Sequence, residues 1–420
     1  MQQMRRSLLL LCLSCLMSCT PQPPALSGRP HFWRPPPQTG DSSTGWLSGD
    51  TLVCVCAVGY PEGYDWFADS TGLREGCRIL VWANGEQVLS LDTGTASGLS
   101  PDGDTHHLAE GHLLSEGFRN GETLLLRDGE MLIHFAGREK LCGYLYSEGR
   151  HYSLWRDRDG TGFTLRKDDI ILQRRENGRP IGDFGDVDRR GGALSLAGGT
   201  ACFAYTLKPG DETACFLSLG GSEILLHKGI GVRFLDARLL DGRTWTLYDD
   251  SQGKTRLSDG ITTYDFSMKG ILLWQEARIV EWEGGPAVLG STLIRGQTTM
   301  LNLLYSLSGE LRICTEGICI PTGRGNETVL CYDSGRRLTL FPWLGTGGSV
   351  EKQILWDSEE GVYFPSGACV SALGERICIG VSPLGGGKPY LWAGRKLGEW
   401  ALNGYICAVE ALLSPPNGGS

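Results

Sequence analysis

The feature that most constrains this fold is the regular return of short apolar runs separated by hairpin-type turns. The runs are rich in β-branched, aromatic and Leu residues and have strand length, and helical periodicity is almost absent. The 61 glycines are spread along the 420 residues rather than gathered in one linker, which indicates many short elements joined by tight turns. Dipeptides that tolerate the positive φ of a two-residue hairpin turn lie between many runs: Asn84-Gly85, Asp128-Gly129, Asp159-Gly160, Asn177-Gly178, Asp259-Gly260 and Asn403-Gly404. The sequence therefore predicts an all-β, antiparallel fold.

An internal repeat narrows this prediction. An aromatic-ended strand, a turn and a short Leu-centred strand return in residues 78–91, 152–168, 244–260, 303–314 and 389–404. Each copy looks like the second and third strands of a four-stranded blade. At about fifty residues per unit, residues 46–413 would form a β-propeller of about seven blades, with six or eight also compatible.

The N-terminus has the features of a lipoprotein signal. Residues 1–18 hold two arginines and then an apolar run that is too short to span a bilayer. The run ends in Leu-Met-Ser before Cys19, which resembles the lipobox of Gram-negative lipoproteins, in which the cysteine is acylated and becomes the new N-terminus. A cut at Cys15 is a second candidate, but Cys12 would then stand where the box requires Leu or Val. An ordinary signal peptide that happens to contain cysteines is the alternative.

Residues 19–45 follow as a Pro-rich tether, because their prolines favour an extended, solvated backbone over packed structure. Residues 414–420 are expected to form a flexible tail. In some gut Gram-negative bacteria an acidic run directly after the lipidated cysteine marks export to the cell surface, and none follows Cys19. We therefore expect an outer-membrane anchor, with the periplasm-facing side favoured over the cell surface.

The first and last repeat units resemble a family of secreted bacterial propeller lipoproteins whose blades read approximately V-A-G-Y, W-K-N-G and L-x-D-G. Residues 57–60 (AVGY) with 81–85 (VWANG) match this pattern, and residues 391–394 (LWAG) match its second part. The middle units match only in architecture. Members of that family are largely uncharacterised, so the resemblance implies a fold and a location but no reaction.

The net charge of −9 excludes some partners. Nucleic acids and anionic lipid surfaces require clustered Lys and Arg, and an acidic chain without such clusters is a poor candidate for either. The partners that remain are the membrane, through the lipid anchor, and an unknown protein or glycan.

Twelve cysteines follow Cys19, mainly inside apolar strand runs. Near a propeller axis a small apolar residue is required, and free Cys serves as one. Cys314 and Cys319 flank a short segment and would be able to pair across a hairpin. Among these twelve, neither a Cys-x-x-Cys pair nor a Cys/His set with zinc spacing occurs, so the sequence suggests no metal and no cofactor.

The strongest metal-like string contains His106, His107 and His112, preceded by acidic residues. Consecutive residues of a strand point to opposite faces, which argues against a shared ion and favours a solvated loop. Residues 157–162 (DRDGTG) offer two carboxylates, fewer than a calcium loop supplies, and are expected to form a hairpin turn.

Three tryptophans, Trp82, Trp155 and Trp392, recur at the same place in their units. They could be sugar-stacking platforms, but a repeated position is what packing between blades demands, and we expect them in the core. No nucleophile elbow, zinc-protease motif or phosphate-binding loop occurs, so no catalytic residue is assigned.

Three function classes remain. The first is a binding or scaffold module for a protein or glycan, the second is a glycoside hydrolase or polysaccharide lyase that uses the central-channel face, and the third is a subunit of an outer-membrane assembly. The first is favoured because propeller loops gather at one end of the fold and the sequence lacks catalytic strings. Lipid attachment at Cys19 is the single site assigned.

Overall fold

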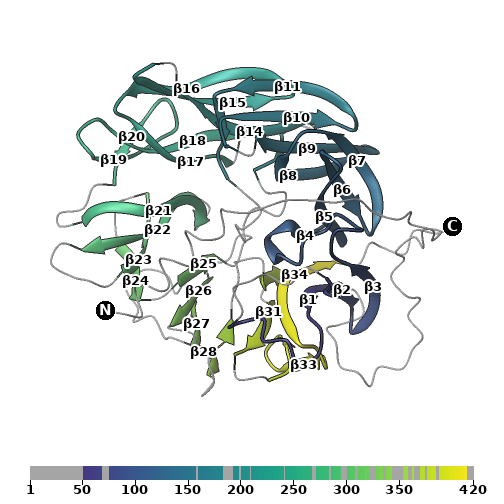
Figure 1. Ribbon diagram of the computed structural model, residues 1–420. Helices are drawn as coiled ribbons and strands as arrows, with labels where there is room; N and C mark the ends of the chain where they lie inside the picture. The colour runs from purple at the N-terminus through teal and green to yellow at the C-terminus, as the bar shows by residue number, and fades with distance from the viewer. Residues whose placement is uncertain are drawn as a thin grey trace.

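The computed structural model describes residues 51–413, with gaps at 69–74, 158, 183–192, 198–199, 209, 241, 267–270, 283–284, 295–299, 308–310, 317, 322–327, 334–336, 343–352, 358–361, 364–368, 374–375 and 385–386. Between residues 311 and 357 it describes the backbone alone. Within these ranges the chain forms eight antiparallel sheets (Figure 1). No helix long and apolar enough to cross a bilayer occurs in the same ranges.

We number the sheets as blades 1 to 8 along the chain. Blade 1 consists of β34 (Gly404–Leu413), β1 (Thr51–Gly59), β2 (Arg78–Ala83) and β3 (Glu86–Asp92). Blades 2 and 3 consist of β4 (His106–Ala109), β5 (His112–Arg119), β6 (Glu122–Arg127), β7 (Glu130–Ala136), β8 (Glu139–Ser147), β9 (Arg150–Asp157), β10 (Gly162–Lys167) and β11 (Ile170–Glu176). Blades 4 and 5 consist of β12 (Gly178–Pro180), β13 (Ser195–Ala197), β14 (Thr200–Leu207), β15 (Glu212–Leu219), β16 (Ser222–Ile230), β17 (Arg233–Leu240), β18 (Arg243–Asp249), β19 (Thr255–Ser258) and β20 (Thr263–Asp265).

Blades 6 and 7 consist of β21 (Ile271–Trp282), β22 (Gly285–Ile294), β23 (Met300–Tyr305), β24 (Leu311–Glu316), β25 (Ile318–Pro321), β26 (Thr328–Asp333), β27 (Arg337–Pro342) and β28 (Gln353–Asp357). Blade 8 consists of β29 (Val362–Tyr363), β30 (Val370–Leu373), β31 (Arg376–Pro383), β32 (Tyr390–Trp392) and β33 (Lys396–Glu399). The blades follow one another around a central axis (Figure 1). This arrangement is a β-propeller, as the sequence predicts.

The ring is closed by pairing between the two ends of the propeller. β34 pairs antiparallel with β1, with Val55 opposite Val409 and Gly59 opposite Gly404. β34 also contacts β30 and β31 of blade 8 and β4 of blade 2. The last strand along the chain is therefore the inner strand of blade 1, and it joins the last blade to the first two.

Two of the predicted hairpin dipeptides do more than form turns, and Asp168, which was not predicted, does the same. Asn84, Asp128 and Asp168 each adopt a positive φ between the third and fourth strands of blades 1, 2 and 3. Each side chain then reaches across to the start of the second strand and accepts a hydrogen bond from a backbone N–H, that of Val53, Leu113 or His151. A short polar residue that tolerates the left-handed conformation is required for both tasks.

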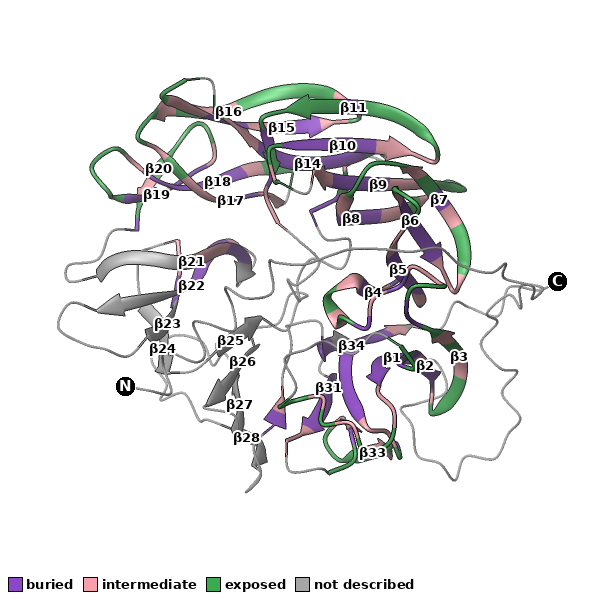
Figure 2. Cartoon of the chain, viewed as in Figure 1, coloured by how far each residue is buried: buried purple, intermediate pink, exposed green. Residues whose placement is uncertain are grey.

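The two faces of strand β1 pack against different neighbouring blades. On β1, Val53, Val55 and Ala57 pack against blade 8, in one cluster with Cys378, Leu391 and Trp400. Cys56 and Val58, on the opposite face of β1, pack toward Leu113 of blade 2. All nine cysteines whose side chains are described are buried and outside any disulfide, as expected of small apolar fillers. Figure 2 shows the buried residues on the inner and central strands and the exposed ones on outer strands such as β11.

Buried carboxylates also join neighbouring blades. Glu116 of blade 2 accepts a hydrogen bond from the Leu141 N–H of blade 3 at 3.0 Å. Asp236 of blade 5 accepts one from the Ile279 N–H of blade 6 at 2.7 Å. Both side chains are almost fully buried, so each satisfies a backbone donor that the junction would otherwise leave unpaired.

Two expectations differ from the structure in detail. The eight sheets lie within the predicted range of six to eight blades; they are one more than the seven favoured, because individual units are shorter than fifty residues, and the strands of blade 2, for example, lie within residues 106–136. The predicted hairpin between Cys314 and Cys319 is wrong. Cys314 lies on β24, which pairs with β23, and Cys319 lies on β25, which pairs with β26 of the next blade.

Candidate functional site

The connection between β1 and β2, residues 60–77, begins with an aromatic-rich segment. Tyr60 to Phe67 contains four aromatic residues interleaved with Pro, Gly and acidic residues. Asn403, just before β34, holds this segment in place. Its Nδ2 donates to the carbonyl oxygens of Pro61 (2.6 Å) and Tyr64 (2.9 Å), and its own carbonyl accepts from the Tyr60 N–H at 2.7 Å.

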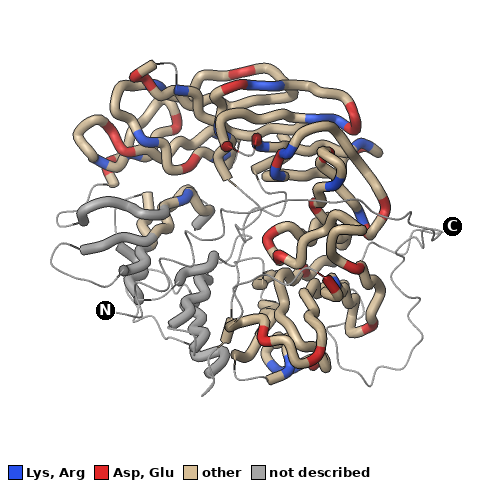
Figure 3. Tube along the Cα trace, in the orientation of Figure 1, with Lys and Arg blue, Asp and Glu red and all other residues tan. Residues whose placement is uncertain are grey.

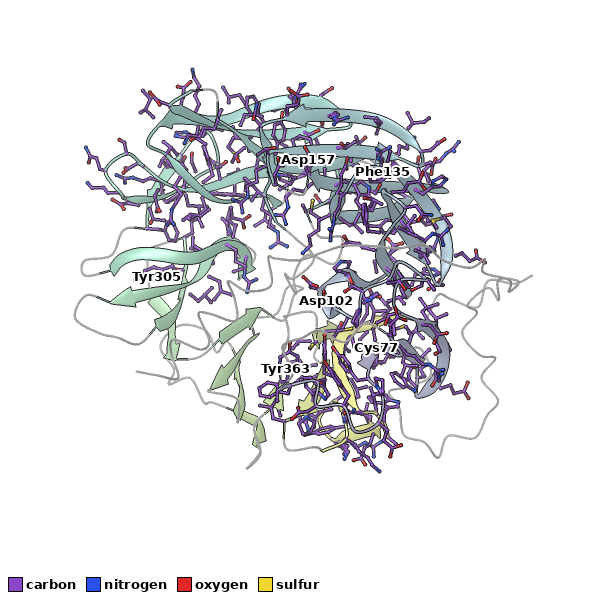
Figure 4. The ribbon with its side chains drawn as sticks, in the orientation of Figure 1. Cys77, Asp102, Phe135, Asp157, Tyr305 and Tyr363 are labelled. Carbon is purple, nitrogen blue, oxygen red and sulfur yellow. The ribbon has the colours of Figure 1, made fainter. Side chains whose placement is uncertain are left out.

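Rings from three distant parts of the chain meet above this segment. The Trp66 ring centroid lies 5.3 Å from that of Tyr363 and 5.2 Å from that of Tyr405. Tyr60 stacks on Tyr64 at 5.4 Å, and Phe67 meets Tyr363 edge-on at 6.1 Å. We call these six residues the aromatic platform: Tyr60, Tyr64, Trp66, Phe67, Tyr363 and Tyr405. It lies where blades 8, 1 and 2 meet, the region in which Tyr363, Asp102 and Cys77 are labelled in Figure 4.

The platform contains both a buried ring and an exposed ring. Tyr405 is buried, and its hydroxyl accepts a hydrogen bond from the Gly103 N–H at 3.1 Å. Phe67 is 58% exposed. Burial raises the pKa of Tyr60, Tyr363 and Tyr405, so these phenols keep their protons at neutral pH and remain hydrogen-bond donors.

Acidic side chains surround the platform. Glu62, Asp65 and Asp102 are exposed, and the Asp102 charge contributes to raising the pKa of Tyr60 and Tyr363. Asp65 also shapes the segment, because its Oδ1 accepts hydrogen bonds from the Phe67 N–H (3.2 Å) and the Ala68 N–H (3.0 Å). The site thus combines ring faces for stacking with carboxylate and phenol groups for hydrogen bonding to a polar ligand.

His106 and His107, which the sequence analysis considered as metal ligands, lie outside the platform and form hydrogen bonds within the fold. His106 and His107 form part of the buried strand β4, so the expected solvated loop is wrong. His106 contacts Ser115 Oγ (3.0 Å) and the Ser100 carbonyl (2.7 Å), and His107 contacts Glu116 (3.1 Å). These separate partners account for two buried imidazoles without a shared ion.

The remaining sequence candidates have structural roles or lie outside the described residues. Asp159 caps its own turn through the Thr161 N–H and hydroxyl, as expected of a hairpin. Trp82 and Trp155 are core residues, as expected, whereas Trp392 is partly exposed. Among the described residues no group of three or more His, Cys, Asp and Glu has the arrangement of a metal site. Cys19 lies outside the described residues.

One pair of carboxylates has the character of acid–base groups. Glu139 and Asp157 are directly opposite each other on β8 and β9. Burial raises the pKa of Glu139, and the Asp157 charge adds to the rise, whereas Arg166 opposes it. The Asp157 carboxylate fills the space above Gly162, where a Cβ would overlap it.

Comparison with known proteins shows no family for this chain. No known protein-family pattern matches the sequence, and no curated protein matches it. A computationally designed protein, Ika8, is 11% identical with a TM-score of 0.45, and the match covers 77% of this chain and 92% of that one. Dipeptidyl peptidase 4 of Porphyromonas gingivalis is 10% identical with a TM-score of 0.44, covering 79% of this chain and 57% of the peptidase.

A lectin of the fungus Aleuria aurantia, described as a six-bladed β-propeller, is 12% identical with a TM-score of 0.30, covering 59% of this chain and 93% of the lectin. These likenesses are too distant to carry a ligand or a reaction over to this chain. The function has to be inferred from its own residues.

The sequence contained part of the signal for the platform. Four aromatic residues within residues 60–67 are unusual for a loop. Tyr60, however, also matches the blade pattern of residues 57–60, so the sequence gives no reason to group it with the other three. Tyr405 on β34 and Tyr363 on β29 could not be assigned to it, because they meet Trp66 only where the last strands of the chain pack against the first blade.

Proposed function

We propose that this protein is a lipid-anchored binding module of the bacterial cell envelope, and that the aromatic platform binds a neutral glycan. The observation that carries the proposal is the cluster in which the Trp66 ring meets Tyr363 edge-on and Tyr405 at a tilt, beside the exposed Phe67. Sugar rings present an apolar face to an aromatic ring and hydroxyls at their edges. A preformed platform binds such a ligand without first having to order its own side chains.

The charges around the platform select among glycans. Carboxylates of Glu62, Asp65 and Asp102 accept hydrogen bonds from sugar hydroxyls and repel anionic sugars. Figure 3 shows both signs of charge interspersed along the strands of blades 1 to 5. A neutral ligand is therefore favoured.

The test is calorimetric titration of the purified mature domain with neutral oligosaccharides built from glucose, mannose, galactose or N-acetylglucosamine. Loss of one stacking ring removes about 1 kcal/mol or more, so Phe67→Ala should raise the Kd of the best ligand about five- to ten-fold. Phe67→Tyr should restore most of the affinity. Trp392→Ala, which removes a partly exposed ring on blade 8, is the matched control and should leave the Kd unchanged.

Two outcomes would refute the glycan proposal: no binding of any neutral oligosaccharide by the wild-type protein, or equal affinity in Phe67→Ala and the wild type. Capture of a protein partner that Phe67→Ala abolishes, without glycan binding, would assign the platform to protein recognition instead.

A glycan-cleaving enzyme is the second candidate, and Glu139 with Asp157 is the observation that favours it. A carboxyl group with a raised pKa opposite a second carboxyl group is the arrangement that glycoside hydrolysis uses. Glu139→Gln should then abolish release of reducing ends from the bound glycan without changing its Kd. This role would be excluded if the wild type released no reducing ends, or if Glu139→Gln released them as fast as the wild type.

A further inference from the structure

A second polar cluster lies at the opposite ends of the strands from the platform, between blades 2 and 3. It consists of Arg127 at the end of β6, Tyr144 and Tyr146 near the end of β8, and His151 near the start of β9. The connections at this end are the two-residue turns, so the side chains stand at the propeller face without a long loop over them.

Arg127 has an unused charge. Its guanidinium carbon lies 5.1 Å from the centroid of the Tyr146 ring. It makes no hydrogen bond or ion pair with any residue in the described part of the chain. A guanidinium held against an aromatic ring keeps its planar fork of N–H donors available to a ligand.

His151 offers a further donor beside it. Its Nδ1 lies 2.6 Å from the Tyr144 hydroxyl, and its ring lies 4.8 Å from the ring of Tyr146. Burial, and next the Arg127 charge, lower the pKa of His151, so the imidazole is neutral at pH 7. Burial raises the pKa of Tyr144, so its hydroxyl keeps its proton; when that hydroxyl donates to Nδ1, the neutral imidazole carries its own proton on Nε2. Nε2 has no partner among the described residues.

The nearby carboxylates are mostly engaged with other groups. Asp128 bonds His112 Nδ1 (2.6 Å) and the Leu113 N–H (2.8 Å). Asp168 bonds Arg150 (3.1 Å) and the His151 N–H (3.0 Å). The Arg127 charge also reaches Glu110, whose pKa burial raises, but the two side chains form no ion pair in the described part of the chain. The cluster is therefore left with donors that no acceptor of the chain satisfies.

From this geometry we propose that Arg127, His151 and Tyr146 form a binding site for a uronic acid residue of an acidic saccharide. The carboxylate would be held by the fork of Arg127 and by His151 Nε2, and the sugar ring would lie against Tyr146, which is 38% exposed. A planar carboxylate matches the guanidinium fork in a bidentate pair, which a spherical anion does not. The proposal goes beyond the neutral-glycan site and does not depend on it.

The test uses the mature domain, with trigalacturonate and a glucuronate trisaccharide as probes, and a neutral galactose trisaccharide, acetate and inorganic phosphate as comparisons. Arg127→Gln should raise the Kd for the uronates about ten-fold or more, and Arg127→Lys should lose most of the affinity, because it keeps the charge but not the fork. Tyr146→Ala should weaken the uronates and leave the affinity for acetate unchanged.

Arg78→Gln is the matched control, because Arg78 is an arginine already paired with an aspartate, Asp92, and it lies on blade 1 rather than in this cluster. It should change the Kd less than two-fold, roughly the effect expected of an exposed pair. Trp66→Ala should also leave uronate binding intact, which separates this site from the platform. Equal affinity of Arg127→Gln and the wild type, or phosphate binding as tight as that of the uronates, overturns the proposal.

Discussion

Trp82 and Trp400 pack against each other with ring centroids 5.0 Å apart, where the last blade meets the first. Trp82 lies on β2, and Trp400 directly follows β33. Both rings are nearly buried and belong to the cluster that also contains Val55 and Ile406. Residues separated by most of the chain thus form one core.

Replacing Trp82 tests this contact. Trp82→Ala should lower the free energy of unfolding by about 3–5 kcal/mol, because it removes a large buried side chain and leaves a cavity. Trp392→Ala, at a partly exposed ring of blade 8, should cost clearly less. Urea unfolding followed by circular dichroism measures both, and equal losses would show that the interface is not packed as described.

Closure of the ring can be tested at Gly404. A Cβ at this position would overlap the Val58 carbonyl on β1. Gly404→Ala should therefore force β34 away from β1 and destabilise the fold by about 2 kcal/mol or more. Ala401→Ser, three positions earlier at an exposed residue, is the control. Hydrogen exchange should rise first in β1 and β34 of the variant; protection unchanged in both strands would contradict the closure.

His106 predicts a dependence of stability on pH. Burial lowers its pKa from 6.5 to about 4 in the folded protein. Between these values the unfolded chain binds the proton and the folded protein does not, so stability is fully present above about pH 6.5 and falls as the pH drops toward 4. The loss should reach about 3 kcal/mol. Urea titrations at several pH values should show a weaker acid dependence in His106→Gln; an identical slope would assign it to other groups.

The proposed anchor predicts a change of cell fraction. Cys19→Ala should move the protein from the membrane pellet to the soluble fraction and abolish incorporation of labelled fatty acid. Cys15→Ala is the matched control and should remain anchored. Release by Cys15→Ala, but not by Cys19→Ala, would move the lipid to Cys15, and release by neither would rule out an acyl anchor at both cysteines.

Local patterns predicted much of the fold. The dipeptide Asn84-Gly85 fixes a hairpin by its own conformational freedom, and the apolar run at 51–59 predicts a buried strand whatever lies beside it. His106 and His107 were misassigned because the residues that satisfy them, Ser115 and Glu116, lie on the next strand. Sequence reasoning places a polar residue in solvent when it cannot identify the buried group that would hydrogen-bond to it.

The candidate sites were less accessible to sequence reasoning. Trp66 joins Tyr405 only through closure of the ring, and Arg127 meets Tyr146 only where two blades pack. Nothing in the residues around Arg127 distinguishes it from Arg150, which is neutralised by Asp168. The difference between an available and an occupied arginine is a property of the assembled blades.

The position of β34 has a consequence for biogenesis. Blade 1 lacks its inner strand until the segment ending at Leu413 has been synthesised. The edge of β1 that pairs with β34 therefore stays unpaired during synthesis of the other blades. If the chain crosses the inner membrane from its N-terminus onward, the exposed edge of β1 needs protection from aggregation throughout that passage. Assembly of the ring is thus coupled to delivery of its final segment.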